Sequence, residues 1–144
     1  MKDCLFCKIV AGEIPSAKVY EDEFVIGFRD IEPQAPVHIL LVPKAHIESL
    51  AATDESQEAL LGHCLAVAAK LGREIEGGFR VVTNSGANAG QTVPHLHFPL
   101  LGGTRLDDKH SFYRMPDRLV FMDEPILIGW TIQHCALTCC ANLS

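Results

Sequence analysis

Apolar residues stand at helical spacing in one long stretch of the chain and at strand spacing in several short ones. From Asp54 to Gly78 they recur three and four positions apart, which predicts one long amphipathic helix with its apolar stripe in the core. Thr53 or Asp54 is expected to cap this helix with the help of Gln57, and Gly77-Gly78 is expected to end it. The predicted stripe consists of Leu60, Leu61, Cys64, Leu65, Val67, Ala68 and Leu71.

A short helix and five strands are predicted around the long helix. Residues 5–10 are typical of a helix that Gly12 closes, and the acidic turn 21–23 joins two strands into a hairpin. The chain order is short helix, hairpin, strand, long helix and two further strands, so we expect an α+β fold with a mostly antiparallel sheet. The predicted strands are 18–20, 24–29, 37–42, 79–83 and the stretch that carries His95 and His97.

The composition is that of a globular chain. Its 144 residues, 48% hydrophobic and 21% charged, are enough for a hydrophobic core. A net charge of −6 without a basic run disfavours nucleic acid as a partner. The N-terminus lacks the apolar run of a signal peptide, and no stretch reaches the roughly 20 apolar residues that a membrane span needs. We therefore expect a cytoplasmic protein whose six cysteines are metal ligands, buried residues or reactive thiols and do not form disulfides.

The hydrophobic pattern loses its period after Gly103. We therefore predict one domain in residues 1–103 and a C-terminal extension in residues 104–144. Residues 119–144 are largely apolar and contain Cys135, Cys139 and Cys140. An extra element packed on the domain, an interaction segment and sequence from a shifted reading frame are all compatible with this composition.

Two closely spaced histidines carry the candidate chemistry. In an extended strand the side chains alternate, so His95, His97 and Pro99 would share one face while the intervening residues are apolar. Residues 84–92, just upstream, form a polar loop with glycines whose N–H groups and side chains could surround an anion. A phosphate held by this loop would face the imidazoles.

These residues resemble the signature of the histidine triad (HIT) family, in which histidines alternate with apolar residues after a Gly-Gln-Ser/Thr-Val segment. The segments 90–93 and 95–98 match that signature, and Pro99 stands where the family has its third histidine. The resemblance covers about residues 4–103 and implies a HIT-like α+β fold, a homodimer and a nucleotide-binding hydrolase or transferase. It also implies cleavage of nucleoside 5′-phosphoramidates or related conjugates, purine nucleosides above all, through a nucleotidyl-histidine intermediate.

The resemblance gives a role to individual residues. His97 matches the expected nucleophile, since a neutral imidazole can attack through one nitrogen when the other donates its proton to a fixed acceptor. His38 and His95 are expected to complete the catalytic set, and Asp30 and Ile31 to hold the ribose and the base. The phosphate is expected to contact Asn84, Gly90, Gln91 and Thr92. A non-catalytic nucleotide-binding or zinc-binding module and an interaction protein that acts through its apolar tail are the alternatives.

Cysteines near the N-terminus suggest a metal site. Cys4, Cys7, His46 and His95 could form a tetrahedral zinc site, although their spacing does not fit a zinc finger. A thioredoxin-like redox motif is disfavoured because no strand precedes Cys4. HIT proteins with this cysteine pair use the first histidine of the motif as a ligand, which implies a structural zinc that orients the segment carrying His97.

Overall fold

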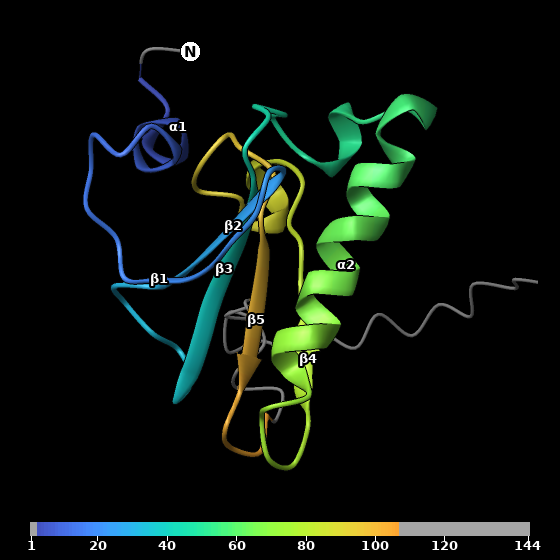
Figure 1. Cartoon of the computed structure of the whole chain (residues 1–144). Coiled ribbons are helices and arrows are strands. Elements are labelled where there is room, and N and C mark those ends of the chain that lie inside the picture. Colours follow the sequence, from blue (N-terminus) through green and yellow to red (C-terminus); the bar gives the residue numbers. More distant parts are fainter. Residues whose placement is uncertain (1–2, 107–144) are drawn as a thin grey trace, which may run out of the picture. The chain divides into compact units, whose positions relative to one another are not determined.

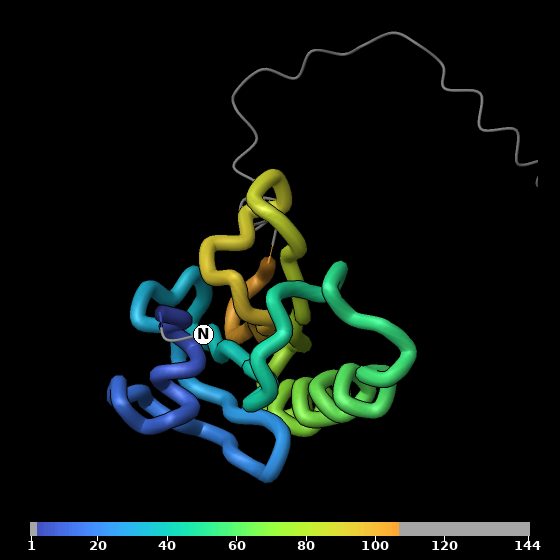
Figure 2. The backbone as a smooth tube through the Cα atoms, turned by 90° about the horizontal axis from the view of Figure 1, so that it is seen from above, coloured from blue at the N-terminus to red at the C-terminus, as the bar shows by residue number. Residues whose placement is uncertain are grey.

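A five-stranded antiparallel sheet separates two helices in the computed structural model, which describes residues 3–106 (Figure 1). The strand order is β1-β2-β3-β5-β4, and α1 and α2 lie on either side of the sheet when it is seen from above (Figure 2). The predicted α+β fold, with one long and one short N-terminal helix, is confirmed. The elements are α1 (Leu5–Val10), β1 (Lys18–Glu21), β2 (Val25–Arg29), β3 (Val37–Pro43), α2 (Glu58–Gly72), β4 (Phe79–Val81) and β5 (Phe98–Gly102), with 3-10 turns at Leu50–Ala52, Glu55–Gln57 and Ala87–Ala89.

Alternation along the strands divides the core into two layers. Side chains of β3 with odd numbers, such as Leu41, pack with α2, whereas those with even numbers, such as Leu40, pack with α1. The core side chains on both faces of the sheet are almost fully buried. Each helix therefore covers one face of the same central strands. The layer under α2 contains Val25, Ile39, Leu41, Cys64, Val67, Ala68, Leu96, Phe98 and Leu100.

Asp54 caps the 3-10 turn Glu55–Gln57, which leads directly into α2 at Glu58, and α2 ends earlier than the sequence predicts. The Asp54 carboxylate accepts the Ser56 N–H at 2.8 Å, and the Gln57 side chain accepts the Asp54 N–H at 2.8 Å, which completes a capping box. Helix α2 ends at Gly72, where a Cβ would lie 2.5 Å from the Phe79 ring, so glycine lets β4 approach the helix.

One residue of the predicted apolar stripe does not face the core. Leu65 is 52% exposed, because at about 100° per residue it lies outside the arc of the helix that the buried Cys64, Val67 and Ala68 occupy.

The last strand begins later than the sequence predicts. Strand β5 starts at Phe98, and His95 and His97 precede it in a segment without ladder pairing. Pro94 has no N–H, the His95 N–H donates to the Val93 carbonyl at 2.8 Å, and the Leu96 N–H donates to Ile47 at 2.6 Å. These bonds, one local and one to a distant segment, replace a strand ladder, so the prediction of a strand through both histidines is wrong.

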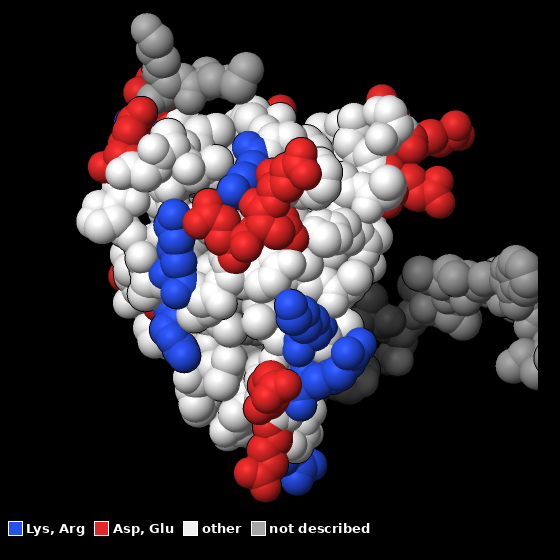
Figure 3. Space-filling model, viewed as in Figure 1, with Lys and Arg blue, Asp and Glu red and all other residues white. Residues whose placement is uncertain are grey.

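Acidic and basic side chains stand beside one another on the face shown in Figure 3. Among the described ion pairs, Glu21 pairs with Lys18 at 3.0 Å and with Lys44 at 2.9 Å. Within residues 3–106, no helix has the length and apolar character that crossing a bilayer requires. The prediction of a C-terminal extension in residues 104–144 lies outside the described residues from position 107 onward.

Asp22 ties the β1–β2 turn to helix α2. Its Oδ2 accepts hydrogen bonds from the Tyr20 hydroxyl at 2.7 Å and from His63 Nε2 at 2.6 Å, while Oδ1 accepts the N–H groups of Phe24 and Val25. Burial by itself raises the pKa of this carboxyl, but these four hydrogen bonds outweigh burial and hold the pKa well below its ordinary value. The charged form of Asp22 is therefore a stabilising element of the fold.

Replacement of Asp22 by Asn is expected to lower the free energy of unfolding at pH 7 by about 1–3 kcal/mol, since a charged acceptor is lost. Because the pKa of Asp22 is lower in the folded chain, its contribution is complete above the unfolded value of about 3.9 and is lost as the pH falls below it. Urea unfolding of both proteins at pH 7 and pH 3 should therefore show a smaller difference at pH 3. Glu23→Gln, which removes an exposed carboxyl of the same turn, is the control. An effect of Asp22→Asn on the free energy of unfolding that is equal at pH 7 and pH 3 would contradict this account.

Candidate active site and metal centre

A pocket of about 740 Å³ opens beside α1 and reaches the segment that precedes β5. Its apolar wall comes from α1, the following loop and the central strands, through Phe6, Ile9, Ile14, Phe28, Leu40 and Pro99. Its polar groups come mainly from loops and from the N-terminal part of β3, through Asp30, His38, Asn84, Thr92 and His97. An apolar pocket with a few convergent polar groups is typical of a small-molecule site.

His97 is held in one tautomer. Its side chain is 9% exposed, and Nδ1–H donates to the His95 carbonyl at 2.7 Å. Since a carbonyl can only accept, Nδ1 carries the proton and Nε2 keeps a lone pair. The Phe6 ring packs edge-on against the imidazole, with centroids 5.3 Å apart. One ring nitrogen thus donates to a fixed acceptor and the other has a lone pair, which are the features expected of a nucleophilic histidine.

His38 lies deeper in the same pocket wall. Its Nδ1 accepts the Gln34 N–H at 3.2 Å, which leaves the proton of the neutral ring on Nε2, 3.5 Å from Asp30 Oδ2. Burial lowers the pKa of His38, and the charge of Asp30 opposes that effect without overcoming it. His38 is therefore neutral near pH 7. Its Nε2 faces the carboxylate of Asp30, the predicted ribose ligand, within the pocket lining.

Three of the four predicted phosphate ligands in the polar loop 84–92 line the pocket, and the fourth does not. Asn84, Gly90 and Thr92 line the pocket, and so does Ile31, which is 95% exposed at the rim. The pocket lining does not include Gln91, whose amide ties three backbone points together. Its Oε1 accepts the Gly86 N–H at 2.8 Å, and Nε2 donates to the carbonyls of Glu48 at 2.7 Å and Val93 at 3.0 Å. Gln91 thus shapes the loop that presents the other residues.

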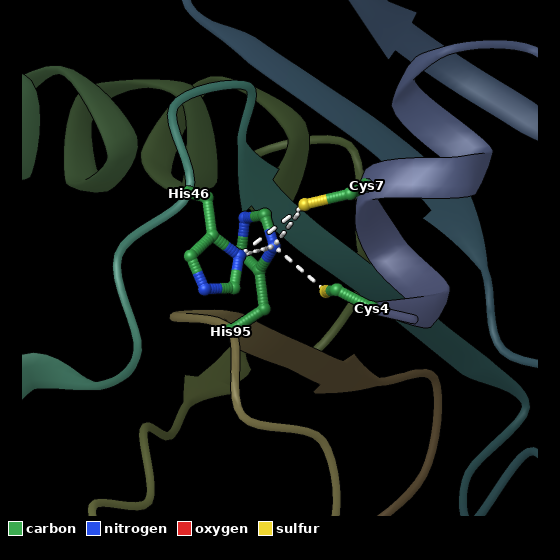
Figure 4. Close-up of side chains that lie close together, drawn as sticks. All are labelled: Cys4, Cys7, His46 and His95. Carbon is green, nitrogen blue, oxygen red and sulfur yellow. Dashed lines mark hydrogen bonds between the residues drawn. The ribbon is translucent and has the colours of Figure 1, made fainter. Parts of the chain in front are cut away.

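Four predicted metal ligands converge beside the pocket (Figure 4). The donor atoms of Cys4, Cys7, His46 and His95 all lie within 4.8 Å of one another. His95 Nδ1 is 3.4 Å from the Cys4 sulfur, 3.6 Å from the Cys7 sulfur and 3.3 Å from His46 Nδ1. Tetrahedral zinc with ordinary bond lengths separates such donors by about 3.3–3.8 Å. The four side chains therefore form a group that could hold zinc.

A further contact fixes the orientation of one of these ligands. His95 Nε2–H donates to the Pro43 carbonyl at 2.9 Å, so that Nδ1, the nitrogen facing the cysteines, is unprotonated. Burial lowers the pKa of His95, and the imidazole stays neutral. A carbonyl that fixes the second nitrogen of a histidine ligand is common at metal sites.

The two histidines of the motif point to different places. His97 lines the pocket, whereas the fully buried His95 belongs to the metal group and is absent from the pocket wall. Sequence reasoning did not find Phe6, which contacts both rings, at 5.3 Å and 5.9 Å between centroids. Its position inside the Cys4–Cys7 pair is the one signal that could have indicated it.

Comparison with known proteins agrees with the fold. The HIT domain matches residues 11–106. An uncharacterized HIT-like protein of Synechocystis is 48% identical over 104 residues, which are 71% of this chain and 91% of that protein. A 14 kDa zinc-binding protein of Zea mays is 46% identical over 107 residues, which are 72% of this chain and 84% of that protein.

Solved structures with high sequence identity have the same fold. A HIT family hydrolase from Legionella pneumophila superposes with a TM-score of 0.70 at 44% identity, over 73% of this chain and 96% of that one. A zinc-bound histidine triad family protein from Mycobacterium smegmatis superposes with a TM-score of 0.65 at 37% identity, over 81% of this chain and 86% of that one.

Proposed function

We propose, because this chain belongs to the HIT domain family, that it is a nucleotide-binding hydrolase or transferase of the phosphoramidase type. Its substrates are purine nucleoside 5′-phosphoramidates or related nucleotide conjugates. The observation that carries this proposal is the hydrogen bond from His97 Nδ1 to the His95 carbonyl, which leaves Nε2 free to attack inside the pocket. Similarity to a HIT family hydrolase supports the reaction class.

The proposed reaction has two steps. In the first, His97 Nε2 attacks the α-phosphorus, and the P–N bond to the leaving amine breaks as the amine takes the electron pair and a proton from solvent water. The resulting imidazolium keeps its Nδ1–H on the His95 carbonyl, which stabilises the new positive charge. In the second step, water attacks the phosphorus, the P–Nε2 bond breaks, and the nucleoside monophosphate leaves while the neutral imidazole is regenerated.

The pocket offers a complementary set of binding groups. We propose that Asp30 accepts hydrogen bonds from the ribose hydroxyls and that Ile31 covers one face of the base, with Phe28 and Ile9 in the apolar wall. Asn84 and Thr92 would donate to the phosphate oxygens, together with the N–H of Gly90. Gln91 and His95 act indirectly, through the shape of the loop and the orientation of His97.

Mass spectrometry of the protein mixed with an adenosine phosphoramidate tests this proposal directly. The expected result is a transient adenylyl adduct on the peptide that contains His97, together with release of AMP. AMP binding without adduct or turnover would favour the alternative, a non-catalytic nucleotide-binding module. Pro99 supports this alternative, because it stands in the pocket wall where the family signature has a third imidazole.

We also propose that Cys4, Cys7, His46 and His95 hold a structural zinc ion. The donor distances, the hydrogen bond of His95 to Pro43 and the similarity to two zinc-binding proteins support this. When bound, the zinc would supply no chemistry to the reaction. It would fix the backbone of His95, whose carbonyl orients the nucleophile.

The purified protein is expected to contain close to one zinc per chain, and its removal by a chelator to lower the free energy of unfolding by about 3 kcal/mol or more. Elemental analysis and thermal unfolding measure both quantities. Cys4→Ser should lose the metal, whereas Cys64→Ala, which alters a buried cysteine in the core beneath α2, should retain it. A metal-free protein whose thermal stability is unchanged by chelation would remove the zinc proposal and leave the hydrolase proposal intact.

The assembly and location that we propose follow the family resemblance. A cytoplasmic homodimer would use the long helix and the edge of the sheet, where Leu65 of α2 is 52% exposed and Phe79 of edge strand β4 is 40% exposed.

A further inference from the structure

Helix α1 belongs to two sites at once. Its residues Phe6 and Ile9 form part of the pocket wall, while Cys4 at its N-terminal end and Cys7 within it face His46 and His95. The helix has only six residues, and no side chain caps its first turn. A helix of this length is not stable by itself in water, so α1 depends on its tertiary contacts for its position.

The contacts of Phe6 connect the two sites. Its side chain is 4% exposed, and its ring lies edge-on to three other rings, at centroid distances of 5.3 Å to His97, 5.9 Å to His95 and 5.8 Å to Phe28. The hydrogen bond at Nδ1 fixes one nitrogen of His97, but a ring can still tilt about such a bond. A ring packed against the imidazole, as Phe6 is, restricts such a tilt.

We propose that Phe6 is a positioning residue, through which the Cys4–Cys7–His46–His95 group controls the orientation of His97 and the closure of the pocket. Metal held by that group fixes α1, α1 fixes Phe6, and Phe6 confines the nucleophile. The inference rests on the proposed function for its nucleotide and zinc ligands. It adds that binding at the two sites is coupled.

Coupling of this kind is reciprocal. If metal and nucleotide both favour the docked position of α1, each raises the affinity for the other by the same factor. We expect a factor of about ten, within the range that is typical of coupled sites. Calorimetric titration of AMP into zinc-loaded and metal-free protein measures one direction. Competition for zinc with a chelator of known affinity, with and without AMP, measures the other.

A measurement without nucleotide tests the role of Phe6 alone. NMR of the histidine rings reports the solvent exchange of the His97 Nδ1 proton, which we expect zinc to slow by about tenfold or more in the native protein. The same slowing is expected in Val10→Ala, which trims an α1 side chain that does not line the pocket. In Phe6→Leu, which keeps an apolar side chain but loses the ring, the effect of zinc should fall to about threefold or less.

The two sets of results separate the inference from the function on which it rests. Equal slowing in Phe6→Leu and in the native protein, or equal AMP affinity with and without zinc, would overturn the coupling. Failure of AMP to bind the zinc-loaded protein would instead overturn the nucleotide-binding function, and the NMR comparison would still decide whether Phe6 positions His97. Thermal unfolding of Phe6→Leu with zinc bound confirms that the comparison concerns a folded protein.

Discussion

Replacement of His97 by Asn is expected to lower the turnover of an adenosine phosphoramidate by about a thousandfold or more and to leave the affinity for AMP within about tenfold. Bond formation depends on one atom, Nε2, which carries the lone pair of the neutral ring because Nδ1–H donates to the His95 carbonyl. Binding is distributed over other groups of the pocket, among them Asp30, Asn84 and Thr92. The substitution therefore removes the reacting atom and few of the binding contacts.

Single-turnover kinetics and calorimetry separate these two effects. His63→Asn is a suitable control, because His63 lies on α2 and pairs with Asp22 outside the pocket, and its turnover should match that of the native protein. The adenylyl adduct should be absent from His97→Asn and present in the control. Turnover that persists in His97→Asn would mean that another group is the nucleophile.

The second large effect is expected at Pro99, where a substitution to His should raise kcat by about tenfold to a thousandfold and change AMP affinity by less than about threefold. Pro99 lines the pocket together with His97, so an imidazole at this position could donate to a phosphate oxygen or to the departing group. Proline has no donor, and the native protein is therefore expected to be a slow enzyme with an intact binding site.

The structural cost of Pro99 is small. Strand β5 pairs with β3 from Phe98 to Gly102 without interruption, and Pro99 stands opposite Leu40. The Pro99 carbonyl accepts the Val82 N–H at 3.0 Å, so its missing N–H faces β4 at the point where that pairing ends, at Val81. From the sequence, this proline is expected to cost both an imidazole donor and a backbone N–H of the strand ladder. Because the ladder is preserved around Pro99, the missing imidazole is the larger cost.

Pro99→Ala is the matched control for the kinetic measurement, since it restores an N–H to the strand without adding an imidazole. A gain in kcat that appears in Pro99→His and not in Pro99→Ala would assign the effect to the side chain. If Pro99→His binds AMP well and gains nothing in rate, the chemical defect lies elsewhere, and the non-catalytic module becomes the better description.

The features that could be predicted from sequence are those set by local chemistry or by a known signature. The capping box of Asp54 and Gln57 depends on residues three positions apart, and it forms as predicted. The group of Cys4, Cys7, His46 and His95 spans most of the domain, and it is expected from its ligand types together with the family resemblance.

The features that the sequence did not reveal depend on tertiary contacts. The start of β5 at Phe98 follows from the bond between Leu96 and Ile47, which belong to segments far apart in the chain. The amide of Gln91 contacts three backbone groups, of which Glu48 belongs to a distant segment, and no local pattern distinguishes that use from direct phosphate binding. Phe6 is an ordinary apolar residue of a short helix, and its importance comes from the two rings that the fold brings to it.

The distance in sequence between the N-terminal thiols and their partners has a consequence for the newly made chain. Cys4 and His95 are 91 positions apart, and ribosomes add about 5–20 residues per second, so Cys4 waits roughly 5 to 20 seconds for His95 to be synthesised. During that interval α1 is too short to be helical alone, and both cysteines are open to oxidants and to competing metal ions. Reducing conditions during translation are therefore expected to protect both thiols until His95 has been made.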